Sequence, residues 1–124
     1  MSVPAELDYC YLTTTGRVSG APHRIEIWFA LQGETVYLLS GGVERSDWVR
    51  NLLASPEVVL ELGDRRRARV ARVIEPDTDE DAVARRLLLD KYTARGNSDL
   101  QEWAATALPV AIDWPTVTTY TSLL

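Results

Sequence analysis

The sequence predicts an α+β fold in which about six short antiparallel strands form a small barrel, with two or three helices packed against it. The strand-like segments follow one another as hairpins separated by Gly-rich turns, and the helical segments do not alternate regularly with them. A chain of 124 residues also has a common size for one domain. We therefore expect a single barrel domain over residues 1–124 rather than a doubly wound parallel sheet.

The first part of the chain predicts three strands in a meander. Residues 7–15 are rich in Tyr, Thr and Leu, and residues 16–22 contain the Gly, Ser and Pro of a turn. Apolar and polar residues then alternate over residues 23–31, which indicates a second strand. A tight turn at 33–34 leads to a third strand over residues 35–40.

The middle of the chain predicts a short helix followed by two more strands. Ser46 is a good N-cap for a helix over residues 47–54, which Pro56 ends. Residues 58–62 and 67–74 have strand composition and are joined by a turn, so they continue the antiparallel sheet.

The last part of the chain predicts two helices and a final strand. Thr78 and Asp81 resemble a capping box for the longest helix, residues 82–94, and a second helix is expected over residues 98–107. Residues 108–112 and 117–120, with Pro115 between them, predict a strand at the edge of the sheet. This order fits a split β-barrel of the FMN-binding type, although periodicity alone also fits other small barrels.

Composition excludes several classes of protein. The net charge of −5 argues against a nucleic-acid binder. The most basic run begins at Arg65-Arg66-Arg67, and alternation is expected to put Arg65, Arg67 and Arg69 on a solvated outer face, with Ala68 and Val70 on the opposite face. One Cys and one His are too few for a zinc site, so we expect no metal. The sequence contains no signal peptide and no membrane-spanning segment, which predicts a cytoplasmic protein.

Two Gly-rich segments are candidates for binding an anionic or polar ligand. The turn 16–20 combines backbone N–H groups, the Arg17 guanidinium and the Ser19 hydroxyl, which suit a phosphate, although such a turn is more often only a hairpin. Ser40, Gly41 and Gly42 end a strand and lead past Arg45 to a helix N-terminus, which also attracts anions. Arg50 could add charge there, although it lies one helical turn from Asp47 and is a candidate surface partner of that residue.

These segments occur within a longer pattern. Residues 12–24, with the sequence LTTTGRVSGAPHR, are followed by IEIWF, and the later LLSGG precedes DWVRNL and Pro56. The order and spacing of these two blocks resemble the signature of the deazaflavin-dependent nitroreductase family. The likeness covers about residues 11–60.

This resemblance implies a split β-barrel oxidoreductase that binds coenzyme F420 and transfers a hydride to a small quinone, nitro or enone acceptor. It implies that Arg17, Val18 and Ser19 hold the phosphate-bearing tail and that Ser40, Gly41 and Gly42 meet the ring edge. The remaining implied cofactor-binding residues are His23, Arg24, Ile25, Glu26, Ile27 and Trp28 along the ring and its linker, and Trp48, Val49, Arg50 and Asn51 on the far side, with Arg45 as an added charge.

The chain departs from the family pattern at Val18, where a Lys or Arg is usual, and we expect this to weaken binding of a polyglutamate tail. Tyr92 is named as a candidate proton donor, although a Tyr on a helix usually serves packing. Split barrels commonly form homodimers, and the same is expected here. The alternatives are an FMN-binding oxidoreductase on the same barrel and a barrel that binds a cofactor without turnover.

Overall fold

The structure is a computed structural model, and it describes residues 4–115. Its strands are β1 (Cys10–Thr15), β2 (Pro22–Ile27), β3 (Ala30–Gln32), β4 (Thr35–Ser40), β5 (Glu57–Leu62), β6 (Arg65–Val73) and β7 (Leu108–Asp113). The α-helices are α1 (Asp47–Ala54), α2 (Asp79–Ala94) and α3 (Gln101–Thr106), with short 3₁₀ turns η1 (Pro4–Glu6) and η2 (Val43–Arg45).

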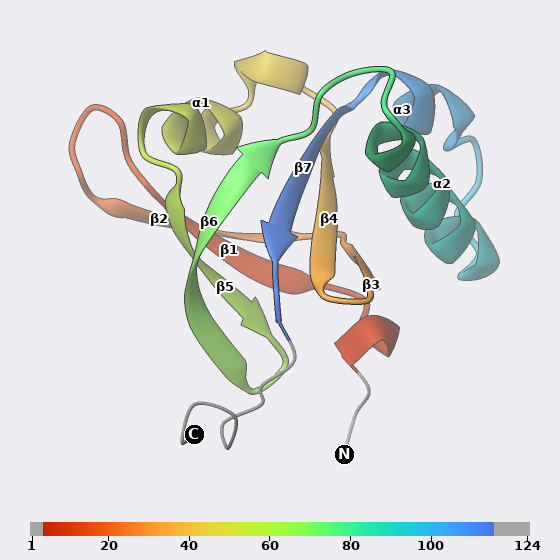
Figure 1. Ribbon diagram of the computed structural model, residues 1–124, viewed down its shortest axis with the longest axis horizontal. Helices are drawn as coiled ribbons and strands as arrows, with labels where there is room; N and C mark the ends of the chain where they lie inside the picture. Colours follow the sequence, from red (N-terminus) through yellow and green to blue (C-terminus); the bar gives the residue numbers. More distant parts are fainter. Residues whose placement is uncertain (1–3, 116–124) are drawn as a thin grey trace, which may run out of the picture.

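Within residues 4–115 the seven strands form one curled antiparallel sheet in the order β2-β1-β5-β6-β7-β4-β3. Strand β6 connects the two halves of the sheet, β2-β1-β5 and β7-β4-β3, because its first residues pair with β5 and its last residues pair with β7. The sheet bends around this long strand into a split barrel, and α2 lies beside β4 with α3 next to it (Figure 1). Helix α1 covers the opposite end, near the hairpin of β1 and β2.

The hydrophobic core has two parts that share β4 and β7. Val36 and Leu38 point into the barrel with Leu12 and Leu60, whereas Tyr37 and Leu39 point to the other face, toward α2. This explains why residues 35–40 form a continuous apolar run, since a strand covered on both faces needs no alternation.

The predicted fold class is confirmed, with seven strands among the described residues instead of about six. The short helix at residues 47–54 and the strand at residues 35–40 have the predicted bounds. The Thr78 half of the predicted capping box is also present, because the Thr78 side chain accepts a hydrogen bond from the Asp81 N–H at 3.2 Å. The Asp81 carboxylate accepts from the Asp77 N–H at 3.3 Å instead of the Thr78 N–H.

The prediction of one continuous strand over residues 23–31 is wrong, because β2 ends at Ile27 and β3 begins at Ala30. The backbone of Phe29, in this break, is bound by side chains of α2. The Tyr92 hydroxyl accepts a hydrogen bond from the Phe29 N–H at 2.9 Å, and Lys91 Nζ donates to the Phe29 carbonyl at 2.9 Å. These tertiary contacts satisfy the backbone that a neighbouring strand would otherwise have paired.

The predicted edge position of the last strand is also wrong. Strand β7 lies inside the sheet between β6 and β4, and its residues 109–112 are buried. Pro109 is tolerated there, although it has no N–H group to donate, and its carbonyl accepts a hydrogen bond from Ile74. The predicted continuation at 117–120 lies outside the described residues.

The predicted orientation of the arginine-rich strand is reversed. Val70 is 59% exposed and Ala68 is exposed, whereas Arg67 and Arg69 are half-buried. The reason is an aromatic partner at the end of β7: the Arg67 guanidinium lies 4.3 Å from the ring centroid of Trp114, and Arg67 Nη1 donates to the Pro115 carbonyl.

Candidate functional site

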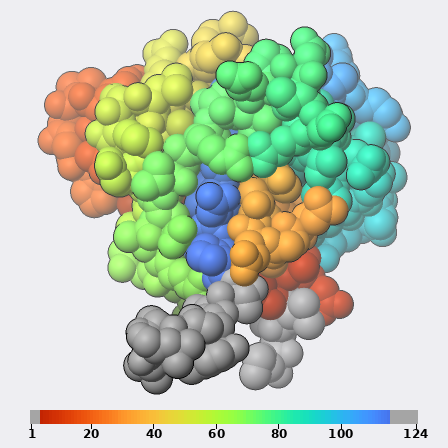
Figure 2. Space-filling model, viewed as in Figure 1, coloured from red at the N-terminus to blue at the C-terminus, as the bar shows by residue number. Residues whose placement is uncertain are grey.

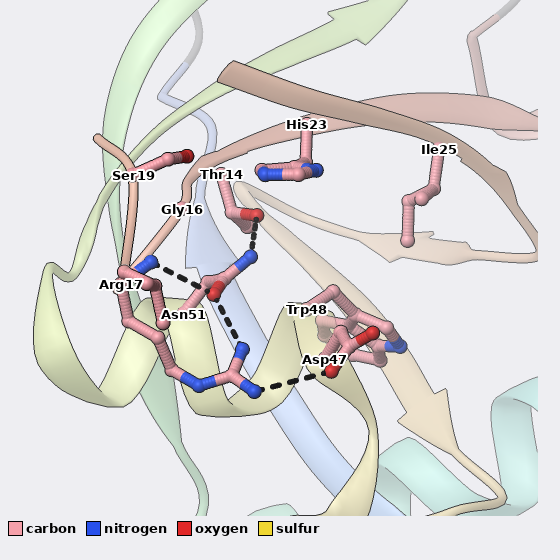
Figure 3. Close-up of a pocket in the computed structure, with 10 residues that line it drawn as sticks. Thr14, Gly16, Arg17, Ser19, His23, Ile25, Asp47, Trp48 and Asn51 are labelled. Carbon is pink, nitrogen blue, oxygen red and sulfur yellow. Dashed lines mark hydrogen bonds and ion pairs between the residues drawn. The ribbon is translucent and has the colours of Figure 1, made fainter. Parts of the chain in front are cut away.

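A pocket of about 440 Å³ lies between the β1–β2 hairpin and the first turn of α1. The loop that closes the hairpin projects from the barrel and lies against α1 in the space-filling view (Figure 2). Side chains from three elements converge on this space (Figure 3). Its lining residues are Thr14, Gly16, Arg17, Val18, Ser19, His23, Ile25, Asp47, Trp48 and Asn51.

The loop after β1 is a closed turn with defined hydrogen bonds. Gly16 N–H donates to the Ala21 carbonyl at 2.7 Å, Gly20 N–H donates to the Gly16 carbonyl at 2.8 Å, and Gly20 has a φ of +77° that favours glycine. Ser19 Oγ accepts from Ala21 N–H at 3.1 Å. Within residues 4–115 the N–H groups of Val18 and Ser19 have no acceptor, so they remain free to bind an anion.

Arg17 is oriented by a buried amide on α1. Asn51 is 3% exposed, and its Oδ1 accepts from the Arg17 backbone N–H at 3.2 Å and from Arg17 Nη1 at 2.8 Å. Asn51 Nδ2 in turn donates to Thr14 Oγ1 on β1 at 3.1 Å. One side chain therefore connects β1, the loop and α1, and it fixes the base of the guanidinium at the pocket (Figure 3).

The outer side of the same guanidinium pairs with Asp47, the first residue of α1. Arg17 Nη2 lies 3.2 Å from Asp47 Oδ1, and the two side chains are 31% and 85% exposed. The helix N-terminus also favours a carboxylate at this position. Sequence spacing suggested Arg50 as the surface partner of Asp47, but the structure pairs Asp47 with Arg17 across the chain.

The wall opposite Arg17 comes from β2 and α1. His23 and Ile25 point from β2 into the pocket, and Trp48 faces them from below (Figure 3). A Cβ atom at Gly16 would lie only 2.7 Å from His23 Nε2, so glycine is needed for the His23 ring to lie over the turn. The pocket thus has a polar, cationic end at the loop and an apolar end toward the barrel.

A second pocket, of about 370 Å³, lies farther along β2 and has more aromatic walls. Trp28 stacks on Tyr92 with ring centroids 4.1 Å apart and an interplanar angle of 4°, and it meets Trp103 edge-on at 5.7 Å. The lining residues are Tyr9, Glu26, Ile27, Trp28, Leu39, Leu100 and Trp103.

The Gly-rich segment after β4 lies beside this second pocket. Gly41 packs against the Trp103 ring, since a Cβ atom at position 41 would lie 3.4 Å from Trp103 Cδ1. The hydroxyls of Ser40 and Ser46 are 2.6 Å apart, and Ser40 Oγ also donates to the Val43 carbonyl at 3.0 Å. Ser46 is the N-cap residue of α1 by position, but its side chain bonds to Ser40 and not to the helix.

Comparison with known proteins gives a family and a fold. The profile of the F420H(2)-dependent quinone reductase family matches residues 3–115. The chain belongs to this family. It is therefore an oxidoreductase that depends on coenzyme F420. No curated protein matches the sequence significantly.

Solved structures confirm the split-barrel fold of this family member. An F420-H2 dependent reductase is 23% identical, with a TM-score of 0.68 over 86% of this chain and 93% of the other. A domain-swapped dimer is 20% identical, with a TM-score of 0.69 over 86% and 80% of the two chains. HutZ, the heme storage protein of Vibrio cholerae, is 14% identical, with a TM-score of 0.68 over 92% and 86%.

The structure brings many of the predicted cofactor residues of this F420-dependent reductase to the two pockets. Those that line the first pocket are Arg17, Val18, Ser19, His23, Ile25, Trp48 and Asn51, and those that line the second are Glu26, Ile27 and Trp28. Gly41 lies next to the second pocket through Trp103, whereas Ser40 and Gly42 contact Ser46, which lines neither pocket. The donor set at the first pocket fits a phosphate, and the aromatic walls of the second fit a flat ring.

Other predicted residues lie away from both pockets. Arg24 forms a bidentate ion pair with Glu61 and lies 4.0 Å from the ring centroid of Tyr11, and this contact lowers the pKa of the Glu61 carboxyl. Val49 is fully buried in the core, and Arg45 and Arg50 are exposed. The two arginines can act on a ligand only at longer range, through charge.

Tyr92 is buried behind Trp28, and its hydroxyl forms hydrogen bonds with backbone groups. Its hydroxyl lies within hydrogen-bond distance of the Asp8 carbonyl at 2.9 Å and of both the N–H and the carbonyl of Phe29. Burial raises the pKa of this phenol to about 12. Its role as a proton donor stays a prediction, and the geometry shows it positioning Trp28 and the break after β2.

Several lining residues have no signal in the sequence. Trp103 lies on α3 and Leu100 is the N-cap residue of that helix, about forty residues after the motif blocks, and Tyr9 precedes the blocks. Within the described residues no group of His, Cys, Asp or Glu could hold a metal ion. No helix in the same part of the chain is long and apolar enough to cross a membrane.

Proposed function

We propose that this chain transfers a hydride from reduced F420 to a small, flat, quinone-type acceptor, with the coenzyme extended along β2. The observation that supports this is the alignment of the two pockets on one strand. Ile25 lines the first pocket, called the cationic pocket after Arg17, and Ile27 lines the second pocket, called the aromatic pocket after Trp28 and Trp103. Residues two apart on a strand face the same side about 7 Å apart, so one elongated molecule can contact both.

The cationic pocket is proposed to hold the phosphate of the coenzyme. The Arg17 guanidinium, the Ser19 hydroxyl and the free N–H groups of Val18 and Ser19 are donors grouped on one loop. The proposed contact set excludes four of the predicted cofactor-binding residues that line neither pocket, which are Arg24, Arg45, Val49 and Arg50.

The aromatic pocket is proposed to hold the ring and the acceptor together. Reduced F420 carries the hydride on its ring, and the protein supplies position and electrostatics. Trp28 is held flat against Tyr92, and Trp103 meets it edge-on, so the pocket offers fixed aromatic walls against which a flat ring can be positioned. This shape favours quinones and nitroaromatics over charged or bulky acceptors.

Binding titrations test the coenzyme assignment. Arg17→Ala should weaken F420 binding by about ten-fold or more, because a charge-assisted hydrogen bond is worth about 1.5–3 kcal/mol. Arg66→Ala, which removes an equally charged exposed side chain on β6, is the matched control and should leave binding unchanged. Equal effects of the two variants would contradict the assignment, and tight FMN binding without F420 binding would favour the FMN alternative.

Steady-state oxidation of reduced F420 tests the acceptor. Trp103→Ala should raise the KM for a quinone such as menadione, whereas Trp114→Ala, a change to a Trp in the barrel core, should act through stability. If reduced F420 binds but no quinone, nitro compound or enone oxidises it, the chain is a cofactor carrier without turnover.

We also propose a cytoplasmic homodimer built from one barrel domain per chain. The support for a dimer is that one of the similar solved structures is a domain-swapped dimer. Light scattering at several protein concentrations would test this, and a monomer at all concentrations would contradict it. Cell fractionation would test the compartment.

A further inference from the structure

The ion pair between Arg17 and Asp47 bears on how the proposed phosphate site works, and the inference below rests on the proposed function. Among residues 4–115, the cationic pocket is lined by one arginine, Arg17, and one acidic residue, Asp47, together with His23. The formal charges of Arg17 and Asp47 cancel. Since Val18 adds no charge to the loop, the site that must attract an acidic coenzyme has almost no net positive charge of its own.

The geometry of the guanidinium restricts how a phosphate can bind. Nη1 is committed to Asn51 at 2.8 Å, and Asn51 is buried and fixed by Thr14. Nη1 keeps a second N–H donor, but both edges of the guanidinium that can make a bidentate contact, Nε with Nη2 and Nη1 with Nη2, include Nη2. Asp47 Oδ1 already lies 3.2 Å from Nη2. A phosphate that takes either edge must therefore displace the Asp47 carboxylate or lie next to a like charge.

The two partners of Arg17 differ in how easily they can be displaced. The Asn51 contacts are buried and include the backbone N–H of Arg17, so they hold the residue in place. The Asp47 side chain is 85% exposed and can rotate into solvent without moving the helix. Because surface ion pairs are weak, Asp47 can yield to a phosphate, but it lowers the affinity when it does so.

We propose that Asp47 is an intramolecular competitor for Arg17 that weakens binding of the phosphate-bearing tail and makes the site prefer coenzyme with a short, weakly charged tail. A longer polyglutamate tail adds negative charge near an exposed carboxylate, so its penalty grows with each glutamate. Asp47 thus acts on specificity through Arg17 and is not a catalytic residue.

The test compares Asp47→Asn with Glu44→Gln by fluorescence titration of the purified protein. Asp47→Asn should tighten F420 binding by up to about five-fold at low salt, the upper range for an exposed ion pair, and the gain should nearly vanish near 1 M salt. Glu44 is exposed on η2 and forms no ion pair among residues 4–115, so Glu44→Gln removes the same charge without freeing Arg17.

Three further comparisons make the result specific. The gain should increase with the number of glutamates on the tail, it should be absent for the phosphate-free deazaflavin with its ribityl chain, and it should disappear in an Arg17→Ala background. Equal affinities of Asp47→Asn and Glu44→Gln for F420 would overturn the inference while leaving the proposed function intact. If the unmodified protein binds no F420 in any form, the proposed function fails, and the inference fails with it.

Discussion

The buried hydroxyl of Tyr92 gives the sharpest prediction about the fold that supports the site. In Tyr92→Phe the ring and its stacking on Trp28 remain, and only the oxygen is lost. The Phe29 N–H, in a residue with no exposed surface, then has no acceptor, whereas the Phe29 carbonyl keeps its bond from Lys91. One unsatisfied buried donor costs about 1–3 kcal/mol, so we expect the free energy of unfolding to fall by about 2 kcal/mol.

Guanidinium denaturation followed by tryptophan fluorescence would measure this change. A loss of about 2 kcal/mol corresponds to a fall in Tm of roughly 5–10 °C for a domain of this size. Tyr37→Phe is the matched control, because its hydroxyl donates to Glu80 at 3.1 Å and Glu80 keeps two bonds from Arg72. We expect it to cost less than about 1 kcal/mol. Equal stability losses in the two variants would refute the reasoning.

The same variant tests whether Tyr92 donates a proton in the reaction. If the hydroxyl only supports the backbone, kcat for quinone reduction should stay within about two-fold at a temperature where the variant is folded. Loss of a general acid typically costs about 100-fold or more. A folded Tyr92→Phe protein with such a loss would establish the catalytic role that the geometry does not support.

Two further perturbations are predicted from close contacts and buried titratable groups. Gly42→Ala should destabilise the protein by about 1–3 kcal/mol, because its Cβ would lie 2.4 Å from Ser46 Oγ, and the double variant with Ser46→Ala should recover part of the loss in the same denaturation assay. Burial raises the pKa of the Cys10 thiol from 9.0 to about 12, so the thiol contributes stability below about pH 9 that is lost as the pH rises toward 12; Cys10→Ala should remove this slope. Burial, together with repulsion from Arg95, lowers the pKa of Lys91 from 10.5 to about 8, so Lys91→Met should remove a gain in stability between about pH 8 and 10.5.

Local signals in the sequence were sufficient for most of the elements. The cap at Thr78, the glycine turns and the alternation in β1 depend on neighbouring residues, and the structure has them where they were expected. The prediction for the arginine-rich strand was wrong because it depends on a residue that is distant in the sequence. Which face of β6 is solvated is decided by Trp114, about forty residues later, whose ring covers Arg67. Alternation defines two faces, but it does not say which of them is buried.

In the site, too, residues within a contiguous motif were predicted, and contacts between distant residues were not. Arg17 and Ser19 were found because their loop is a contiguous motif, and the family pattern added His23 and Trp48. Asp47 was read as a surface partner of Arg50, since i to i+3 spacing on a helix is the only relation visible in the sequence. Its actual partner lies thirty residues earlier and is set by the packing of the loop on α1.

The break after β2 shows how tertiary contacts convert a strand pattern into part of a pocket. On a continuous strand Trp28 would share the face of Arg24 and Glu26, which are exposed. Because Tyr92 and Lys91 bind the backbone of Phe29, the chain turns at this point and the Trp28 ring packs between Tyr92 and Trp103 instead. The aromatic wall of the second pocket therefore depends on α2, a helix that contributes no lining residue itself. It follows that changes on the buried face of α2 should alter acceptor binding as well as stability, even though they lie outside both pockets.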